Sequence, residues 1–169
     1  MEIFETERVR LRHFVPGDLD ALYALYSDPE IRQFYPDGTL SYEATREELE
    51  WFLHGHPRHP ELGLWAMIHK PTGRFIGRSG LLPWTIDRRD EVEVAYMLDK
   101  AFWGQGLATE VAQGLVRHGF ETLGLRRLIA LVHPHNEPSI KVAHRINMEL
   151  ERVGEDEQGP FQLFAIAAP

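Results

Sequence analysis

The stretch that decides the fold reads Val92-Glu93-Val94-Ala95-Tyr96-Met97-Leu98-Asp99-Lys100-Ala101-Phe102-Trp103-Gly104-Gln105-Gly106-Leu107-Ala108-Thr109-Glu110. Its first seven residues are typical of a strand. Leu107 begins a helix, because apolar residues recur from there to Leu123 at spacings of three and four. The next run, 128–132, is apolar throughout, as in a strand buried on both faces. Residues 92–132 therefore form a β-α-β crossover, whose two strands should lie parallel.

Around this crossover, the rest of the chain alternates between helical and extended patterns. Strands are predicted at 8–14, 63–69, 74–82, 148–153 and 161–167, and further helices at 18–28, 42–54 and 138–146. No repeat or linker divides the chain. We therefore expect one α/β domain (α+β in some schemes) over residues 1–169. Its sheet should be mixed and mostly antiparallel around a central parallel pair, with helices on both faces.

The composition excludes several classes of protein. The chain has 169 residues, is 43% hydrophobic and carries a formal charge of −8, so it is neither disordered nor a natural partner of nucleic acid or anionic membranes. Cysteine is absent, which rules out disulfides, thiolate metal sites and a thiol nucleophile. No apolar run reaches the roughly 18 residues of a membrane span, and the first residues lack the pattern of a signal peptide. We expect a soluble cytoplasmic protein, monomeric or homodimeric.

A glycine-bearing loop links the central strand to the long helix. Gly104 and Gly106 let the main chain approach a ligand, and the amides of residues 105–109 would be unpaired at the helix start. This is an anion site that needs no charged side chain. The loop lacks the third glycine of a dinucleotide fingerprint and the lysine of a P-loop. The alternative is an ordinary tight turn whose glycines serve packing.

Glu93 lies in the middle of the central strand, where a buried carboxylate would have a raised pKa and could take up a proton, directly or through water. Ala95 and Met97 share its face and leave space there. The alternatives are that Glu93 faces solvent or pairs with an arginine across the sheet. Glu91 lies on the same face, which also permits a paired-carboxylate glycosidase, although nothing else suggests a sugar cleft.

A second polar loop, 133–139, follows the other parallel strand. The carboxyl ends of parallel strands gather ligands, so this loop should neighbour the glycine loop. Asn136 or Ser139 could hydrogen-bond a ligand there, or Asn136 could simply cap the following helix. The histidines of residues 54–59 and 133–135 lack metal-binding spacing, so we expect no metal.

Taken together, these motifs resemble the GCN5-related N-acetyltransferase (GNAT) superfamily, in particular the branch that includes bacterial ribosomal-protein N-terminal acetyltransferases. The resemblance covers nearly the whole chain, through the stretches 6–12, 27–31, 93–98, 102–110 and 136–139 and the closing strands. It implies that residues 1–169 form a single N-acetyltransferase domain. Such a domain binds acetyl-CoA and transfers the acetyl group to a primary amine, on a protein N-terminus or a small molecule, by direct attack in a ternary complex.

The resemblance also implies roles for individual residues. The pyrophosphate would lie on the loop made of Trp103, Gly104, Gln105, Gly106, Leu107 and Ala108, with Thr109 beside it. The pantetheine arm would enter between splayed strands and meet the main chain of Met97 and Leu98, with Asn136 and Ser139 in contact. Glu93 would be the general base, and Ser139 would protonate the leaving thiolate. Ala95 and Asn147 stand where this branch has glycine.

Two other functions stay open at this point. The same fold could be a non-catalytic acyl-CoA-binding module, or an unrelated protein could bind a nucleotide phosphate on the same glycine loop. The acceptor amine is not readable from the sequence. Its specificity should come from residues 28–63 and from the last hairpin, with the Pro/His-rich loop 54–60 at the border of the cleft.

Overall fold

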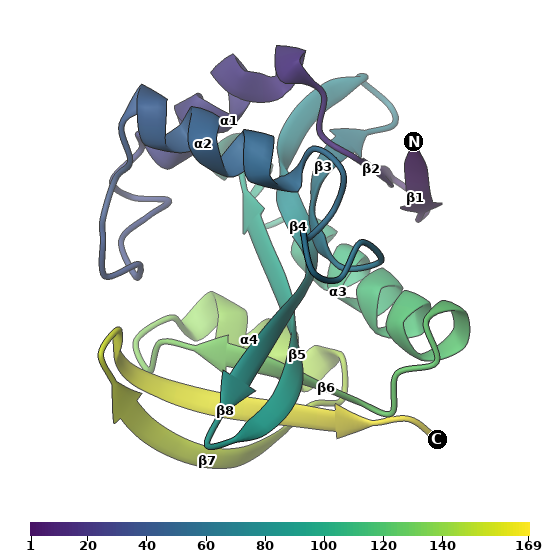
Figure 1. Cartoon of the computed structure of the whole chain (residues 1–169), viewed down its shortest axis with the longest axis vertical. Helices are drawn as coiled ribbons and strands as arrows, with labels where there is room; N and C mark the ends of the chain where they lie inside the picture. The colour runs from purple at the N-terminus through teal and green to yellow at the C-terminus, as the bar shows by residue number, and fades with distance from the viewer.

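The computed structural model describes all residues from Met1 to Pro169. It contains one eight-stranded sheet in the order β1-β2-β3-β4-β5-β6-β8-β7 (Figure 1). The strands are β1 (Glu2–Glu5), β2 (Val9–Arg12), β3 (Gly63–His69), β4 (Arg74–Ile86), β5 (Arg89–Leu98), β6 (Arg127–Val132), β7 (Glu149–Asp156) and β8 (Gly159–Ala167). Only β5 and β6 pair in parallel. The predicted mixed sheet with a central parallel pair is confirmed.

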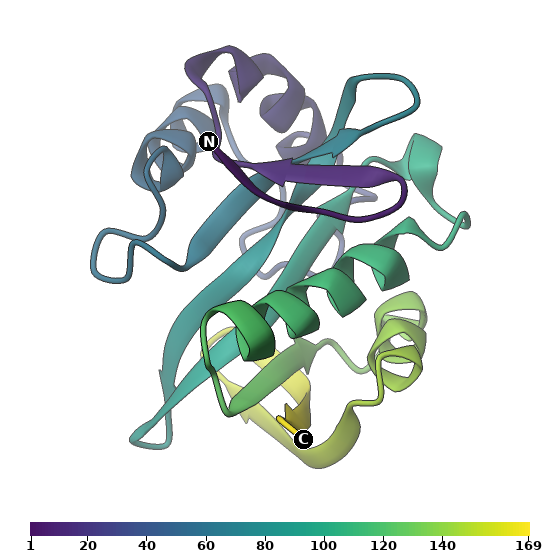
Figure 2. The same cartoon turned by 90° about the vertical axis from the view of Figure 1, so that its right-hand side faces the viewer.

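The helices cover both faces of the sheet. They are α1 (Leu19–Tyr26), α2 (Tyr42–Phe52), α3 (Leu107–Arg117) and α4 (Glu137–Arg145). Side chains of α1 and α2 pack with residues of β3 and β5 in one apolar core, and side chains of α3 and α4 pack with every strand from β2 to β6 in the larger one. In Figure 2, α3 crosses in front of the sheet and α4 lies beside its lower strands, at the right.

Three elements differ from the sequence prediction. Strand β1 was not expected, and it lies against β2 at the sheet edge. The predicted polar turn at 87–90 shortens to two residues, because Asp87 and Arg88 both adopt positive φ angles, 50° and 63°, which suit the tightest hairpin turn. The long helix ends as an α-helix at Arg117 and continues to Thr122 as a wider π-turn that contains Gly119, a poor helix former.

The parallel pair β5–β6 is joined at one point only, where Glu93 lies opposite Ile129. Beyond this point the two strands diverge (Figure 1). The edge of β5 that faces β6 therefore has no strand partner over residues 94–98, although its other edge stays paired with β4. A sheet opened in this way offers unpaired main-chain groups to whatever lies in the gap.

Candidate functional site

The gap between β5 and β6 opens into a groove of about 2180 Å³. The groove gathers residues that lie far apart in the sequence. Of the predicted site residues it contains Glu93, Met97, Leu98, Trp103, Gly104, Gly106, Leu107, Ala108, Thr109, Asn136 and Ser139. Gln105 is the one that does not line it. The two polar loops after the parallel strands thus border the same space, as their topology predicted.

The glycine loop presents its amides to the groove. Gly104 and Gly106 have φ angles of 73° and 78°, a left-handed conformation that glycine adopts without strain. Gly106 is the N-cap of α3 and contributes no capping side chain. The main-chain amides of residues 104–109 find no acceptor within the protein, so they are free to bind an anion at the positive end of the helix dipole. The geometry fits a phosphate-bearing ligand.

Glu110, one residue further along α3, has a structural task instead. Its carboxylate accepts hydrogen bonds from the Thr6 hydroxyl at 2.6 Å and from the Arg8 main chain and Nε, both at 2.7 Å. Arg8 also donates from Nη1 to the Gln105 carbonyl at 2.9 Å. Although burial alone would raise its pKa, the bonds from Thr6 and Arg8 hold the pKa of Glu110 below its usual value. The N-terminal segment is thereby fixed to the glycine loop.

Glu93 is half-buried at the junction of the two parallel strands. It lies opposite Leu82 of β4, and its Oε2 accepts a hydrogen bond of 2.6 Å from the indole of Trp84, its diagonal neighbour across the pair. Burial raises the pKa of Glu93 to about 7, although the Trp84 bond, the Arg78 charge and the Leu131 main chain all act to lower it. Glu93 is therefore neither fully exposed nor paired with an arginine.

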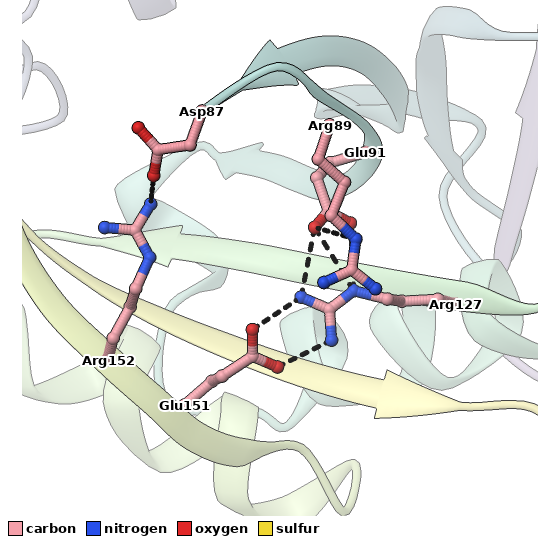
Figure 3. A network of polar contacts seen from close by, with 6 residues as sticks. All are labelled: Asp87, Arg89, Glu91, Arg127, Glu151 and Arg152. Atoms are coloured by element: carbon pink, nitrogen blue, oxygen red, sulfur yellow. Dashed lines mark hydrogen bonds and ion pairs between the residues drawn. The ribbon is translucent and has the colours of Figure 1, made fainter.

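Glu91 is instead the carboxylate bound by arginines (Figure 3). It is only 6% exposed and lies 3.0 Å from Arg127 Nε, and Arg89 approaches to 3.5 Å. Arg127 also pairs with Glu151 of β7 at 2.6 Å. Because two guanidinium groups neutralise Glu91, it is not free to act with Glu93 as a second catalytic carboxylate. The geometry does not support a glycosidase.

Ser139 and Asn136 lie at the start of α4. Asn136 Oδ1 accepts a hydrogen bond from the Ser139 amide at 3.3 Å, so it caps the helix, as the structural alternative proposed. The Ser139 hydroxyl accepts a hydrogen bond of 3.0 Å from the hydroxyl of Tyr96 on β5. Burial raises the pKa of Tyr96 to about 12, and the bond to Ser139 opposes this shift only in part. Tyr96 therefore stays protonated and serves as a donor.

Trp103 and Leu98 are linked to each other. The Trp103 indole donates to the Leu98 carbonyl at 2.9 Å, which holds the glycine loop against the end of β5. Leu98 thus already uses one of its main-chain acceptor positions on the free edge, whereas the Met97 carbonyl lies against Gly77 on the β4 side of the strand.

The prediction missed several groove residues. Tyr96 and Trp84 act through contacts that the sequence does not reveal. Arg78, which is 4% exposed, donates to the hydroxyls of Tyr26 and Tyr35. The sequence could have indicated Arg78, because an arginine inside the largely apolar stretch 75–82 is unusual.

The histidine-rich loop 54–60 contributes His56, Arg58 and His59 to the groove wall, where the acceptor border was expected. No three His, Asp or Glu side chains come together in a way that could hold a metal ion. None of the helices is long and apolar enough to cross a membrane.

Comparisons with known proteins agree with this geometry. The family model described as the acetyltransferase (GNAT) domain matches residues 8–149. The chain is 32% identical over 148 residues to the uncharacterised protein YkkB of Bacillus subtilis (strain 168), covering 87% of this chain and 85% of that protein. It is 30% identical over 152 residues to the uncharacterised N-acetyltransferase p20 of Bacillus licheniformis, covering 89% and 84%.

Among solved structures, the chain resembles the ribosomal L7/L12 α-N-protein acetyltransferase RimL in complex with coenzyme A. The TM-score is 0.81 at 19% identity, over 99% of this chain and 98% of that chain. At this level of identity the likeness shows the fold alone.

Proposed function

The chain belongs to the GNAT acetyltransferase family, and on that premise we propose that residues 1–169 bind acetyl-CoA and transfer its acetyl group directly to a primary amine. The observation that carries the proposal is the groove at the β5–β6 junction. It brings the unpaired amides of the glycine loop, the free edge of β5 and the half-buried Glu93 into one space. The groove thus has groups that could bind the phosphates, groups that could bind the pantetheine arm, and a carboxylate that could remove the proton of the amine.

The glycine loop and β5 would hold acetyl-CoA. The amides of residues 104 and 106–109 bind the pyrophosphate, and Gln105, which does not line the groove, helps to hold the loop through the bond from Arg8 to its carbonyl. On the free edge of β5, Tyr96 and Leu98, rather than Met97, offer main-chain groups to the pantetheine amides, because these groups alternate along a strand and those of Met97 face β4. An unpaired amide on the same edge can stabilise the oxyanion that forms when the thioester carbonyl is attacked.

Glu93 would remove the proton of the attacking amine. An amine must be neutral to attack, and an α-amine with a pKa near 7.7–8.0 is largely charged at neutral pH. A carboxyl group with a pKa of about 7 is matched to this task, because it is partly ionised at pH 7 and still basic enough to accept the proton. The Trp84 indole keeps its carboxylate oriented.

Ser139 would protonate the leaving thiolate while accepting the proton of Tyr96, and Tyr96 would then regain a proton from water. Successive side chains of a strand alternate between faces, so Glu93 and Tyr96 lie on opposite faces of β5. Acceptor and thiolate would therefore be served from opposite sides of the strand edge. With no cysteine in the chain, the acetyl group has no thiol on which to rest, which favours direct transfer.

The test is an acetyl-CoA-dependent screen of amines. Panels of amino acids, polyamines, antibiotic amines and peptides with free N-termini are incubated with the full chain, and acetylated products are measured by mass spectrometry. The peptide panel matters because the RimL relative modifies a protein α-amine. The proposal expects at least one acceptor, and Glu93→Gln should lose its turnover while binding CoA as tightly as the wild type.

Other outcomes would point elsewhere. Tight binding of acetyl-CoA without any acetylated amine would favour a non-catalytic acyl-CoA-binding module. Stronger thermal stabilisation by a mononucleotide than by CoA would favour a nucleotide-phosphate binder.

A further inference from the structure

Arg78 is a buried cation on the acceptor side of the groove. It lies in the middle of β4, opposite Met97 of β5, and only 4% of its surface is exposed. Its side chain points toward α1 and the segment that follows, where it meets Tyr26 and Tyr35. Arg78 and Tyr35 both line the groove.

The guanidinium of Arg78 is only partly satisfied. Nε donates to the Tyr26 hydroxyl at 2.9 Å and Nη2 donates to the Tyr35 hydroxyl at 3.2 Å. These two bonds use two of the five N–H groups of an arginine, so three have no acceptor in the protein. No carboxylate lies within the 4.0 Å of an ion pair with Arg78, although 15 such pairs form elsewhere.

The nearby carboxylates do not accept hydrogen bonds from the remaining N–H groups of Arg78. Asp37 pairs with Arg32, a second buried arginine whose guanidinium stacks on the Tyr35 ring at 4.3 Å. Glu48 acts on Arg78 through its charge, but its Oε2 is buried without any hydrogen-bond partner. The pocket around Tyr35 therefore holds two buried guanidinium groups and only one carboxylate in direct contact with either.

A buried guanidinium whose N–H groups lack acceptors is unfavourable, and a ligand that supplies a carboxylate in direct contact relieves that cost. The planar fork of a guanidinium matches a carboxylate in particular, because two parallel N–H groups meet its two oxygens. Arg78 also lies on the same sheet face as Glu93, with the small residues Gly80 and Ala95 between them. A ligand that reaches from one to the other meets no bulky side chain of these two strands.

We propose that Arg78 binds a carboxylate carried by the acceptor, so that the preferred substrates are amines whose molecules also bear a carboxylate. The inference rests on the proposed acetyl transfer and names the substrate class of the same groove. The amine lies toward Glu93 and the carboxylate toward Arg78 and the Tyr35 hydroxyl. The register places the two strand positions four residues apart, about 13 Å along the sheet. Acceptors with a spacer between amine and carboxylate should therefore fit better than compact α-amino acids.

The test compares acceptors that differ only in the negative charge. The value of kcat/KM is measured for a series of ω-amino acids and for the matching ω-amino amides, whose amines have similar pKa values when the spacer is long. Short peptides that begin Ser-Asp or Ser-Asn form a second arm, which separates a small acceptor from a protein N-terminus. Aminoalkyl phosphates form a third arm.

The wild type should favour the carboxylate over the amide by about 10- to 100-fold, the effect of one charge-assisted bond. In Arg78→Met this preference should fall to about threefold or less, mainly through KM, while CoA binding is unchanged. Arg78→Lys should retain only part of it, since a lysine lacks the planar fork. Arg58→Met is the matched control, because Arg58 is an exposed arginine of the same groove, and it should keep the preference.

Several results would overturn the inference. These are equal rates for acid and amide in the wild type, a stronger preference for the phosphate series, and an equal loss in Arg58→Met. A fall in kcat for every acceptor in Arg78→Met would place Arg78 at the thioester instead. A screen in which no amine reacts refutes the proposed function itself. Calorimetric titration of the ω-amino acids into the CoA-bound protein then tests the carboxylate site separately. If Arg78→Met binds them as tightly as the wild type does, the carboxylate site is refuted as well.

Discussion

At the level of single residues, Glu93 is subject to opposing influences on its charge. Burial favours the protonated form, while the Trp84 indole and the Arg78 charge favour the ionised one, and the result is a pKa of about 7. A surface glutamate with its usual pKa would be ionised but too weak a base, and a fully isolated one would hold its proton at neutral pH. The position of Glu93 gives it a base strength between these limits.

This balance predicts a pH profile. In the wild type, kcat/KM should fall about tenfold per pH unit below pH 7, because the base becomes protonated. Glu93→Gln should lower kcat/KM by about 100- to 1000-fold, and the midpoint of the acid limb should move from about pH 7 to the pKa of the acceptor amine. The measurement is kcat/KM from pH 5.5 to 9 with one acceptor. An unchanged profile in the variant would assign the base to another group.

Unfolding experiments provide the control for Glu93→Gln. Ionised Glu93 destabilises the fold, and this cost appears as the pH rises from the ordinary carboxyl value of 4.5 to about 7. The variant should therefore be as stable as the wild type at pH 4 and more stable, by about 2 kcal/mol, at pH 8. If Glu93→Gln is at least as stable as the wild type, its loss of activity is not caused by unfolding.

Tyr96 and Ser139 should behave as one unit, because they share a hydrogen bond. Tyr96→Phe and Ser139→Ala are each expected to lower kcat by about 10- to 100-fold, and the double variant should lose little more than the worse single variant. The losses should shrink when the acyl donor has a more acidic leaving thiol, since that thiol needs no protonation. Fully multiplicative losses would show that the two residues act independently.

At the level of elements, the sequence was most informative where a pattern is local. The stripe of apolar residues predicted α3, and the apolar run 128–132 predicted β6. The four residues of β1 were missed because so short a stretch holds too little periodicity to stand out. Contacts between distant segments could not be read at all, since nothing in residues 6–8 indicates that Glu110 will accept their hydrogen bonds.

For the site, the sequence indicated the positions but not all of the roles. Glu93 and the glycine loop were found because a carboxylate in a strand and two glycines before a helix are visible locally. The different roles of Glu91 and Glu93 depend on Arg127 of β6, which pairs with Glu91, and on Trp84 of β4, which donates a hydrogen bond to Glu93. A pattern with period two places both carboxylates on one face and cannot separate them.

The link between Glu110 and the N-terminal segment predicts an acid-sensitive contribution to stability. A carboxyl whose folded pKa lies below its usual value stabilises the fold above the unfolded pKa, and the effect disappears as the pH falls through the folded pKa. Glu110→Gln should therefore cost about 1–3 kcal/mol at pH 7 and progressively less in acid. Urea unfolding at pH 7 and pH 3.5 measures the difference. Glu5→Gln, which alters only exposed ion pairs, should cost less than about 1 kcal/mol.

At the level of the whole molecule, the groove exists because the sheet is nearly divided. Strands β1 to β5 form one part and β6, β8 and β7 the other, and one opposed residue pair joins them within the sheet. The cluster of Glu91, Arg127 and Glu151 bridges the parts on the other side of that junction from the splayed ends (Figure 3). We infer that this cluster fixes the angle at which the two parts diverge, and with it the width of the groove.

Arg127→Met tests this, because it leaves the carboxylate of Glu91 buried with only the exposed Arg89 nearby. The loss should be about 3 kcal/mol in urea unfolding, and Glu91→Met combined with Arg127→Met should recover most of it, since a matched apolar pair leaves no charge unpaired. Arg152→Met, which removes the exposed pair with Asp87, should cost less than about 1 kcal/mol. If the cluster sets the groove, the double variant will regain stability but still bind CoA more weakly than the wild type. If CoA affinity returns together with stability, the cluster supports the fold without shaping the site.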